Sequence, residues 1–326
     1  MAPCISILIP AHNASKWIAE TIQSALSQTW TRKEIIVVDD GSTDDTLAIA
    51  RRFASPDIRV VSQHKQGASA ARNTAFAHSQ GDYIQWLDAD DVLAPDKIAR
   101  QIQALRPWES RRTLLSCAWG RFTTRPERAT FTPTPLWRDL SPVEWMLRKM
   151  EQNIYMQTTA WLVSRELAEA AGPWDARLWV DDDGEYFTRV ILASDSVRFV
   201  PEARTYYRES GSDSLSQIGL SKRKREAQLL SLELSVARLR AVEESERVRA
   251  ACMQALQMYL NYILPEEQDL LKRAEALATS LGGRLAPPVV SWRHALLKAF
   301  LGATAAKRTQ LHYRELKSAL KSNLSA

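Results

Sequence analysis

The sequence predicts an α/β protein, in which a mostly parallel sheet with covering helices is followed by a C-terminal α-helical region. Short β-branched apolar runs alternate with helical patterns up to about residue 105, as βαβ units require. Long helical patterns without strands take over after residue 219. Of the 326 residues 45% are hydrophobic and 25% are charged, so a folded core is expected rather than a disordered chain.

Four strands and four helices are expected in the first 105 residues. The apolar runs lack alternation, as in strands buried on both faces, and Pro95 fits the first turn of a helix. The expected strands cover residues 5–9, 34–39, 59–62 and 83–87, and the expected helices cover 18–26, 47–53, 68–79 and 95–105. Because parallel strands end at one edge of the sheet, that edge is where a ligand is expected.

Residues 106–218 are interrupted by prolines and are less regular. In this stretch the expected elements are strands at 114–118 and 157–163 and a helix at 142–150. Farther on, helical patterns cover 229–248 and 250–263, followed by breaks at Pro265 and Gly282-Gly283. We therefore expect two parts, residues 1–218 and 219–326, that meet near Gly219.

The charge is distributed unevenly along the chain. The whole sequence carries +5, whereas residues 219–326 hold 18 Lys+Arg against 10 Asp+Glu, which leaves −3 for the first 218 residues. An acidic first part with a basic second part differs from the uniformly basic surface of a nucleic-acid binder, so no nucleic-acid partner is expected.

The cysteines and the apolar segments indicate a cytoplasmic protein. Cys4, Cys117 and Cys252 are far apart, so neither a Cys-x-x-Cys metal knuckle nor a disulfide framework is indicated, which fits a reducing compartment. The short apolar run at the N-terminus has no basic lead and is not expected to be a signal peptide. No stretch approaches the ~20 apolar residues of a membrane span.

Acidic residues follow two of the predicted strands. Asp39 and Asp40 end the second strand, and Asp88, Asp90 and Asp91 end the fourth, so all five are expected at one edge of the sheet. Crowded carboxylates repel one another unless a cation compensates, and an Asp-x-Asp pair suits Mg²⁺ or Mn²⁺. The sequence therefore predicts a divalent metal site that includes Asp88 and Asp90, with a solvated acidic turn as the alternative.

A second acidic cluster, Asp181-Asp182-Asp183, precedes a helical pattern. Negative side chains are favoured at a helix N-terminus, which is one explanation for the cluster. Three adjacent aspartates exceed what capping requires, so one of them is also a candidate general base.

Four blocks in the first 93 residues resemble glycosyltransferase family 2, the inverting group with the GT-A fold. They read ISILIPAHN, IIVVDDGSTDDT, QGASAARN and YIQWLDADDVL, in this order. A weaker resemblance continues through Gly172-Pro-Trp-Asp175 to Tyr207-Arg208 and ends before Gly219. It implies a Rossmann-like GT-A domain at residues 1–218, with nucleotide-sugar binding in 1–105 and the acceptor side and catalytic base in 106–218.

The resemblance also implies roles for individual residues. Those expected to line the nucleotide pocket are Pro10, Ala11, His12 and Asn13. Asp40 would contact the base, Asp39 would assist it, and Gly67 and Arg72 would lie beside the donor. Asp90 would bind the metal directly, and Asp88 would lie closer to the ribose or to a metal-bound water. Asp183 takes the place of the catalytic base, but Asp182 is an alternative because the family commonly has Glu-Asp where this chain has Asp182-Asp183.

The implied activity is inverting transfer of a sugar from a nucleotide-diphospho-sugar, with a UDP-sugar as the expected donor. The acceptor would be a glycan or a lipid-linked molecule, in the synthesis of a surface polysaccharide or another glycoconjugate. A dehydrogenase is disfavoured because the first strand leads into Pro10-Ala-His-Asn13 without a Gly-x-Gly-x-x-Gly turn. A sugar nucleotidyltransferase and an inactive nucleotide-sugar or glycan-binding scaffold remain as alternatives.

Tryptophans and the basic tail add weaker signals. Six tryptophans surround the expected acceptor side, most of them expected in the core and one or two available to stack on a sugar or a lipid-linked acceptor, namely Trp119, Trp137, Trp145, Trp161, Trp174 and Trp179. Residues 284–326 hold eight Lys+Arg and one acid in an amphipathic pattern. This pattern predicts either peripheral contact with the inner face of the membrane or a helix that closes a helical subdomain.

Overall fold

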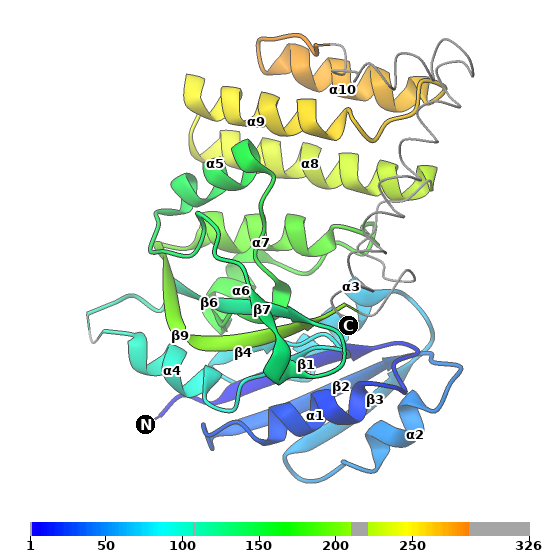
Figure 1. Ribbon diagram of the computed structural model, residues 1–326, viewed down its shortest axis with the longest axis vertical. Coiled ribbons are helices and arrows are strands. Elements are labelled where there is room, and N and C mark those ends of the chain that lie inside the picture. The colour runs from blue at the N-terminus through cyan, green and yellow to red at the C-terminus, as the bar shows by residue number, and fades with distance from the viewer. Residues whose placement is uncertain (1, 107, 210–220, 287–326) are drawn as a thin grey trace.

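A computed structural model describes residues 2–106, 108–209 and 221–286 (Figure 1). Within these residues the first sheet has five strands in the order β3-β2-β1-β4-β8. Four strands are parallel and β8 runs antiparallel to β4. The strands are β1 (Ile5–Ala11), β2 (Lys33–Asp40), β3 (Ile58–Gln63), β4 (Tyr83–Trp86) and β8 (Val163–Ser164). The four strands predicted for the first 105 residues are thus confirmed.

Both faces of this sheet are buried, which explains the apolar runs without alternation. Ile5, Ile7 and Ile9 of β1 point into one core, together with residues of α1, α2 and α4. Leu8 points to the opposite core, with Ala71 and Ala75 of α3. The helices are α1 (Ile18–Leu26), α2 (Thr46–Arg51), α3 (Ala68–Ala77) and α4 (Lys97–Ala104). Alternate side chains of β1 therefore point into two different hydrophobic layers, and neither set faces water.

A smaller second sheet in the described chain has the order β5-β9-β6-β7. Its strands are β5 (Val92–Leu93), β9 (Ser196–Arg208), β6 (Thr113–Phe122) and β7 (Thr130–Phe131). The predicted strand at 114–118 is confirmed within β6, whereas β9 was not predicted. Pro201 lies where the β6–β9 pairing steps from Cys117↔Val200 to Ala118↔Arg204, so the proline falls in a bulge where it needs no ladder hydrogen bond.

The predicted strand at 157–163 is wrong. Residues Thr158–Ala160 form a 3-10 turn, and only Val163–Ser164 pair as β8. Buried side chains donate the hydrogen bonds that the carbonyls of this segment accept. Gln85 Nε2 donates to the Thr159 carbonyl at 3.0 Å, and Gln101 Nε2 donates to the Ala160 carbonyl at 3.1 Å. Lys97 donates to both glutamine side chains and completes the buried network.

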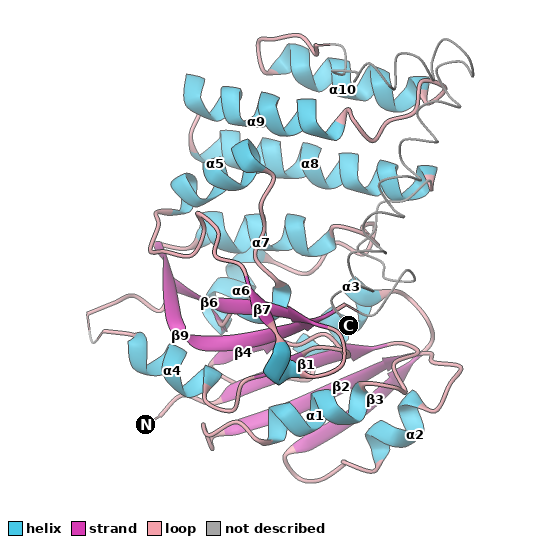
Figure 2. Cartoon of the chain, in the orientation of Figure 1, coloured by secondary structure: helices cyan, strands magenta, loops and turns pink. Residues whose placement is uncertain are grey.

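The helices beyond the first sheet pack against one another, and most of them form a stack that includes the C-terminal region (Figure 2). They are α5 (Pro142–Gln152), α6 (Arg165–Ala171), α7 (Asp182–Ala193), α8 (Lys222–Val242), α9 (Glu246–Tyr259) and α10 (Gln268–Ser280). One hydrophobic cluster runs from Trp86 through Tyr186 to Leu229, Leu256 and beyond. The C-terminal helices therefore share a core with the α/β part rather than forming a separate appendage.

The predicted helix at 229–248 is interrupted. The described chain leaves the helical conformation at Glu243, and Ser245 starts α9 by accepting a hydrogen bond from Val248 N. None of the helices in the described ranges is both long and apolar enough to cross a membrane. The basic segment 284–326 lies almost entirely outside the described residues, so its expected amphipathic helix does too.

Candidate active site

A cleft of about 2000 Å³ opens where the carboxyl ends of β1, β2 and β4 face helices α5, α7, α8 and α9. It brings together sequence-predicted residues separated by more than 170 positions. Those that line it are Pro10, Ala11, His12, Asn13, Asp40, Gly67, Arg72, Asp88, Asp90, Asp182 and Asp183. Asp39 is the one predicted site residue that does not line the cleft.

Asp40, at the end of β2, organises the loop that leads into α3. Its Oδ1 accepts hydrogen bonds from Gln63 Nε2 and Gln66 N, both at 2.8 Å, and its Oδ2 accepts from Gly67 N at 2.7 Å. Gly67 has φ +99°, a conformation in which a side chain would be strained. The Asp40 carboxylate and the glycine at position 67 thus fix the backbone conformation of residues 66–67 on this wall of the cleft.

Asp39 lies beneath the cleft floor and is only 1% exposed. Its Oδ2 accepts from Ser42 N at 3.3 Å and from Ser62 Oγ at 3.5 Å. Its Oδ1 has no hydrogen-bond partner among the described residues. Asp39 therefore supports the turn after β2 from below.

The loop after β1 is joined to the turn after β2. His12 Nδ1 hydrogen bonds to the Asp40 carbonyl at 3.0 Å, and Asn13 Oδ1 accepts from Thr43 N at 2.8 Å. Asn13 has φ 49°, in the left-handed region that asparagine tolerates better than most residues. These contacts hold residues 10–13, which line the cleft, against the turn at residues 40–43.

Arg72 of α3 joins the two acidic clusters. Its Nη2 contacts Asp88 Oδ1 at 2.8 Å and its Nη1 contacts Asp182 Oδ2 at 2.6 Å. The guanidinium lies 4.3 Å from the centre of the Trp174 ring, which itself stacks on Tyr186. Burial acts to lower the pKa of Arg72, but the carboxylates of Asp182 and Asp88 outweigh it and raise the pKa, so Arg72 is a permanent cation. This one buried arginine fixes the distance between the strand-end acids and the α7 acids.

The three acids after β4 have different surroundings. Asp88 and Asp90 line the cleft, whereas Asp91 is fully buried and accepts from Arg208 N at 2.9 Å and from Thr159 Oγ1 at 3.3 Å. Burial, with the nearby charges of Asp90 and Asp88, raises the pKa of Asp91 well above its usual value. Of the three acids expected at this edge of the sheet, Asp91 thus joins β4 to β9 inside the fold, and Asp88 and Asp90 are exposed to the cleft.

Asp88 and Asp90 suit a metal that is shared with a ligand. No group of three or more His, Cys, Asp or Glu side chains converges on a complete metal site in the part of the chain that the structure describes. Mg²⁺ commonly needs only one or two carboxylates when a substrate diphosphate and waters supply the remaining oxygens. The oxygen donors present fit such a half-site and do not fit a metal held by the protein alone.

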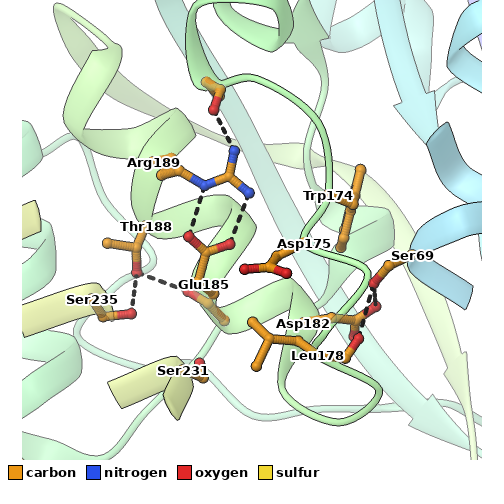
Figure 3. A network of polar contacts seen from close by, with 12 residues as sticks. Ser69, Trp174, Asp175, Leu178, Asp182, Glu185, Thr188, Arg189, Ser231 and Ser235 are labelled. Atoms are coloured by element: carbon orange, nitrogen blue, oxygen red, sulfur yellow. Dashed lines mark hydrogen bonds and ion pairs between the residues drawn. The ribbon is translucent and has the colours of Figure 1, made fainter. Parts of the chain in front are cut away.

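The α7 aspartates occupy three different environments. Asp181 adopts φ 58° before the first helical residue, and its carboxylate accepts from Ser231 Oγ of α8 at 2.5 Å. Asp182 accepts from Ser69 Oγ at 2.9 Å (Figure 3). It also forms the ion pair with Arg72. Asp183 faces the cleft, with Thr158 Oγ1 3.4 Å from its Oδ2. Asp182 is thus held by a cation and a hydroxyl, whereas Asp183 accepts from the Thr158 hydroxyl and, at 2.9 Å, from Gly184 N.

Asp183 has the electrostatics of a general base. Its burial, together with the charges of Asp182 and Asp181, raises its pKa to about 7. A base whose pKa lies near the working pH combines availability with proton affinity. Farther along the same helix, Arg189 and Glu185 form an ion pair at 2.7 Å that stabilises the first turns of α7 (Figure 3).

Three contributors were not predicted from the sequence. Ser69, Thr158 and Ser231 contact the α7 aspartates from α3, the 3-10 turn and α8. Ser69 lies inside the third motif block, which was the available signal for it. Thr158 and Ser231 lie in segments without a motif, so only the tertiary structure identifies them.

Most of the acceptor-side tryptophans are core residues, as expected. Trp119, Trp145, Trp161 and Trp174 are each at most 6% exposed. Trp179 is partly exposed and lines the cleft, with the Arg223 guanidinium 4.7 Å from its ring.

The chain is similar to known proteins in both sequence and structure. The profile of the family described as Glycosyl transferase family 2 matches residues 6–170. The chondroitin synthase of Escherichia coli is 47% identical over 98 residues, which are 29% of this chain and 14% of that protein. The uncharacterized glycosyltransferase EpsJ of Bacillus subtilis is 29% identical over 226 residues, 67% of this chain and 64% of the relative. The chain spans less than half the length of several curated relatives that it matches.

Solved structures share the fold at low identity. S. aureus TarS 1–349 in complex with UDP-GlcNAc has a TM-score of 0.65 at 17% identity, covering 96% of this chain and 92% of that one. The mannosyltransferase PcManGT from Pyrobaculum calidifontis, in complex with GDP-Man and Mn²⁺, has a TM-score of 0.54 at 20% identity, covering 99% and 88%. The similarity extends through the C-terminal helices as well as the α/β part, as the coverage shows.

Proposed function

Since the chain belongs to glycosyl transferase family 2, we propose that it is an inverting enzyme that moves a sugar from a nucleotide-diphospho-sugar to an acceptor hydroxyl. The observation that carries the proposal is that Asp88, Asp90 and Asp183 line one cleft, in which Arg72 joins Asp88 to Asp182, the neighbour of Asp183. A donor on one wall and a base on the other are what a one-step displacement requires.

The donor would occupy the wall formed by β1, β2 and α3. The nucleotide pocket would be lined by Pro10, Ala11, His12 and Asn13. Asp40 would contact the nucleobase, and Gly67 and Arg72 would lie beside the diphosphate. Known structures with the same fold contain UDP-GlcNAc or GDP-Man, which supports a nucleotide-sugar, and we propose a UDP-sugar.

Asp90, assisted by Asp88, would hold a divalent ion together with the donor diphosphate. Bound there, Mg²⁺ or Mn²⁺ would stabilise the negative charge on the leaving nucleotide. The oxygen ligands at the end of β4 support this assignment, as does the Mn²⁺ that accompanies GDP-Man in the PcManGT complex.

Asp183 is the better candidate for the catalytic base than Asp182. Asp182 already binds Arg72 and Ser69, and a carboxylate held in an ion pair is a weak proton acceptor. Asp183 has a pKa of about 7 and faces the cleft. We therefore assign proton abstraction to Asp183 and positioning of Arg72 to Asp182.

The reaction would proceed by direct displacement. Asp183 removes the proton of the acceptor hydroxyl, whose oxygen attacks the anomeric carbon as the bond to the nucleotide diphosphate breaks. Attack from the face opposite the leaving group inverts the anomeric configuration. Arg72 carries a positive charge beside the diphosphate throughout, so the leaving group departs into a site already arranged for its charge.

The acceptor is proposed to be a growing glycan or lipid-linked sugar of a surface polysaccharide or another glycoconjugate, handled in the cytoplasm or at the inner face of the membrane. A donor screen by thermal shift, with Mn²⁺ and a panel of nucleotide-sugars, tests the proposal, because a ligand that binds the folded state raises its apparent stability. Stabilisation by a nucleotide-sugar, followed by its turnover, is the expected result. Binding without turnover would favour the scaffold, and pyrophosphate release from a nucleoside triphosphate would favour a nucleotidyltransferase.

A further inference from the structure

The half of the cleft away from the donor wall presents an aromatic ring to solvent. Tyr155 is 44% exposed and lines the cleft. The other large hydrophobic side chains with high exposure in the described residues, Trp108 and Val242, do not line it. An aromatic ring that is exposed inside a functional cleft indicates a surface that contacts a ligand, rather than a defect in the packing of the core.

Tyr155 is held rigidly in this position. Arg121 Nη2 donates to its hydroxyl at 2.6 Å, and Arg121 Nη1 in turn contacts Glu209 Oε1 at 3.0 Å. The Tyr155 ring lies 5.6 Å from the ring of Trp119, centre to centre, at an interplanar angle of 30°. One side of the ring is thus supported and the hydroxyl is fixed, so little side-chain entropy is lost when a ligand packs against the ring.

The ring lies close to the proposed base. Thr158, three residues later, has its hydroxyl 3.4 Å from Asp183 Oδ2. Three residues of extended chain span at most about 11 Å, which limits the separation between Tyr155 and Thr158. Burial raises the pKa of the Tyr155 hydroxyl, Arg121 opposes this effect, and the charge of Asp183 adds to it.

The Tyr155 ring and the size of the cleft favour a sugar ring as the ligand at this place. Arg121, the cation that contacts Tyr155, is already paired with Glu209. The cleft volume of about 2000 Å³ exceeds the roughly 300–1,000 Å³ of common small-molecule pockets, so it can hold an acceptor beside the donor. A pyranose has an apolar face of C–H groups that packs on an aromatic ring, which a linear polyol phosphate lacks.

We propose that Tyr155 determines acceptor specificity by stacking on the pyranose ring that carries the attacked hydroxyl. The inference rests on the proposed glycosyl transfer and names its acceptor class, a glycan that ends in a pyranose rather than a linear polyol phosphate. Tyr155 positions this sugar, and Asp183 removes its proton.

The test compares Tyr155→Ala and Tyr155→Phe with Trp108→Ala, a control at an exposed aromatic outside the cleft. Donor hydrolysis without acceptor and sugar transfer to an acceptor are measured separately. The acceptors are trisaccharides that end in glucose, galactose or N-acetylglucosamine, with tri(glycerol phosphate) as the competing class. Tyr155→Ala is expected to raise the acceptor KM at least tenfold while the donor KM and donor hydrolysis stay within twofold of wild type. Tyr155→Phe and Trp108→Ala are expected to keep the acceptor KM within about threefold of wild type.

Three results would overturn the inference: an unchanged acceptor KM in Tyr155→Ala, a preference for tri(glycerol phosphate) over every trisaccharide, or refusal of all the trisaccharides by a wild-type enzyme that hydrolyses its donor. Failure of the proposed function itself looks different, because the wild-type protein would then neither bind nor hydrolyse any nucleotide-sugar.

Discussion

Replacing Asp183 by asparagine removes one proton-accepting oxygen and changes little else in the cleft. The carboxylate has a pKa of about 7, so about a tenth of it is ionised at pH 6 and about nine tenths at pH 8. If Asp183 is the base, the wild-type kcat/KM should rise about tenfold between these two pH values. Loss of a general base costs about 10²–10⁴ in rate, so Asp183→Asn should lower kcat by that factor and abolish the acid limb of the profile.

Asp182→Asn is the matched control at the neighbouring position. It weakens the ion pair with Arg72, so the donor KM should rise while the acid limb near pH 7 persists. Steady-state kinetics from pH 5.5 to 8.5 with a labelled donor would separate the two variants. Retention of kcat within tenfold by Asp183→Asn, with a larger loss in Asp182→Asn, would refute the assignment of the base.

The same substitution makes a prediction about stability. Burial raises the pKa of Asp183 in the folded state from 3.8 to about 7, so ionisation of this group opposes folding. The cost is absent well below pH 4, grows as the pH rises from 4 to 7 and stays constant above 7. Asp183→Asn should therefore melt at a higher temperature than wild type at pH 8, measured with EDTA, and the gap should close toward pH 4. A lower melting temperature for the variant at pH 8 would contradict the burial that explains the pKa.

Four further changes test other parts of the structure. Asp90→Ala should abolish Mn²⁺-dependent transfer and weaken donor binding by calorimetry without lowering the melting temperature by more than a few degrees; full activity would remove Asp90 from the metal site. Gly184→Ala brings a Cβ into collision with the Asp181 carboxylate, so it should destabilise the fold by about 1–3 kcal/mol in urea unfolding and lower kcat. Ser231→Ala removes a hydroxyl that binds Asp181, so it should cost about 1 kcal/mol and reduce kcat with an unchanged donor KM, which would show that α8 supports the active site. Removal of residues 284–326 should abolish flotation of the protein with anionic liposomes, and equal flotation of both forms would exclude this segment as a membrane contact.

Much of the donor half could be predicted from the sequence because its signals are local. Strands buried on both faces read as apolar runs, and acids placed directly after two parallel strands must meet at one edge of the sheet. Asp40, Asp88 and Asp90 accordingly line one cleft. Asp91 differs because Arg208, 117 residues away, binds it inside the fold, and no local pattern records that partner.

The acceptor half was less predictable because distant partners determine it. The apolar run at 157–163 has strand composition, yet the buried side chains of Gln85 and Gln101 bind its carbonyls and hold it as a turn. Tyr155 and Ser231 owe their positions to Arg121 and α7. By contrast, the end of α8 had a local signal in Ser245, a good N-cap residue that the long helical pattern concealed.

The stereochemistry of the product tests the central claim most directly. An α-linked nucleotide-sugar identified in the donor screen is incubated with enzyme and acceptor, and the anomeric proton of the new linkage is read by NMR before any rearrangement. Displacement assisted by Asp183 from the face opposite the diphosphate predicts a β-linked product from wild type and almost none from Asp183→Asn. An α-linked product would contradict the one-step mechanism and the role of Asp183 in it.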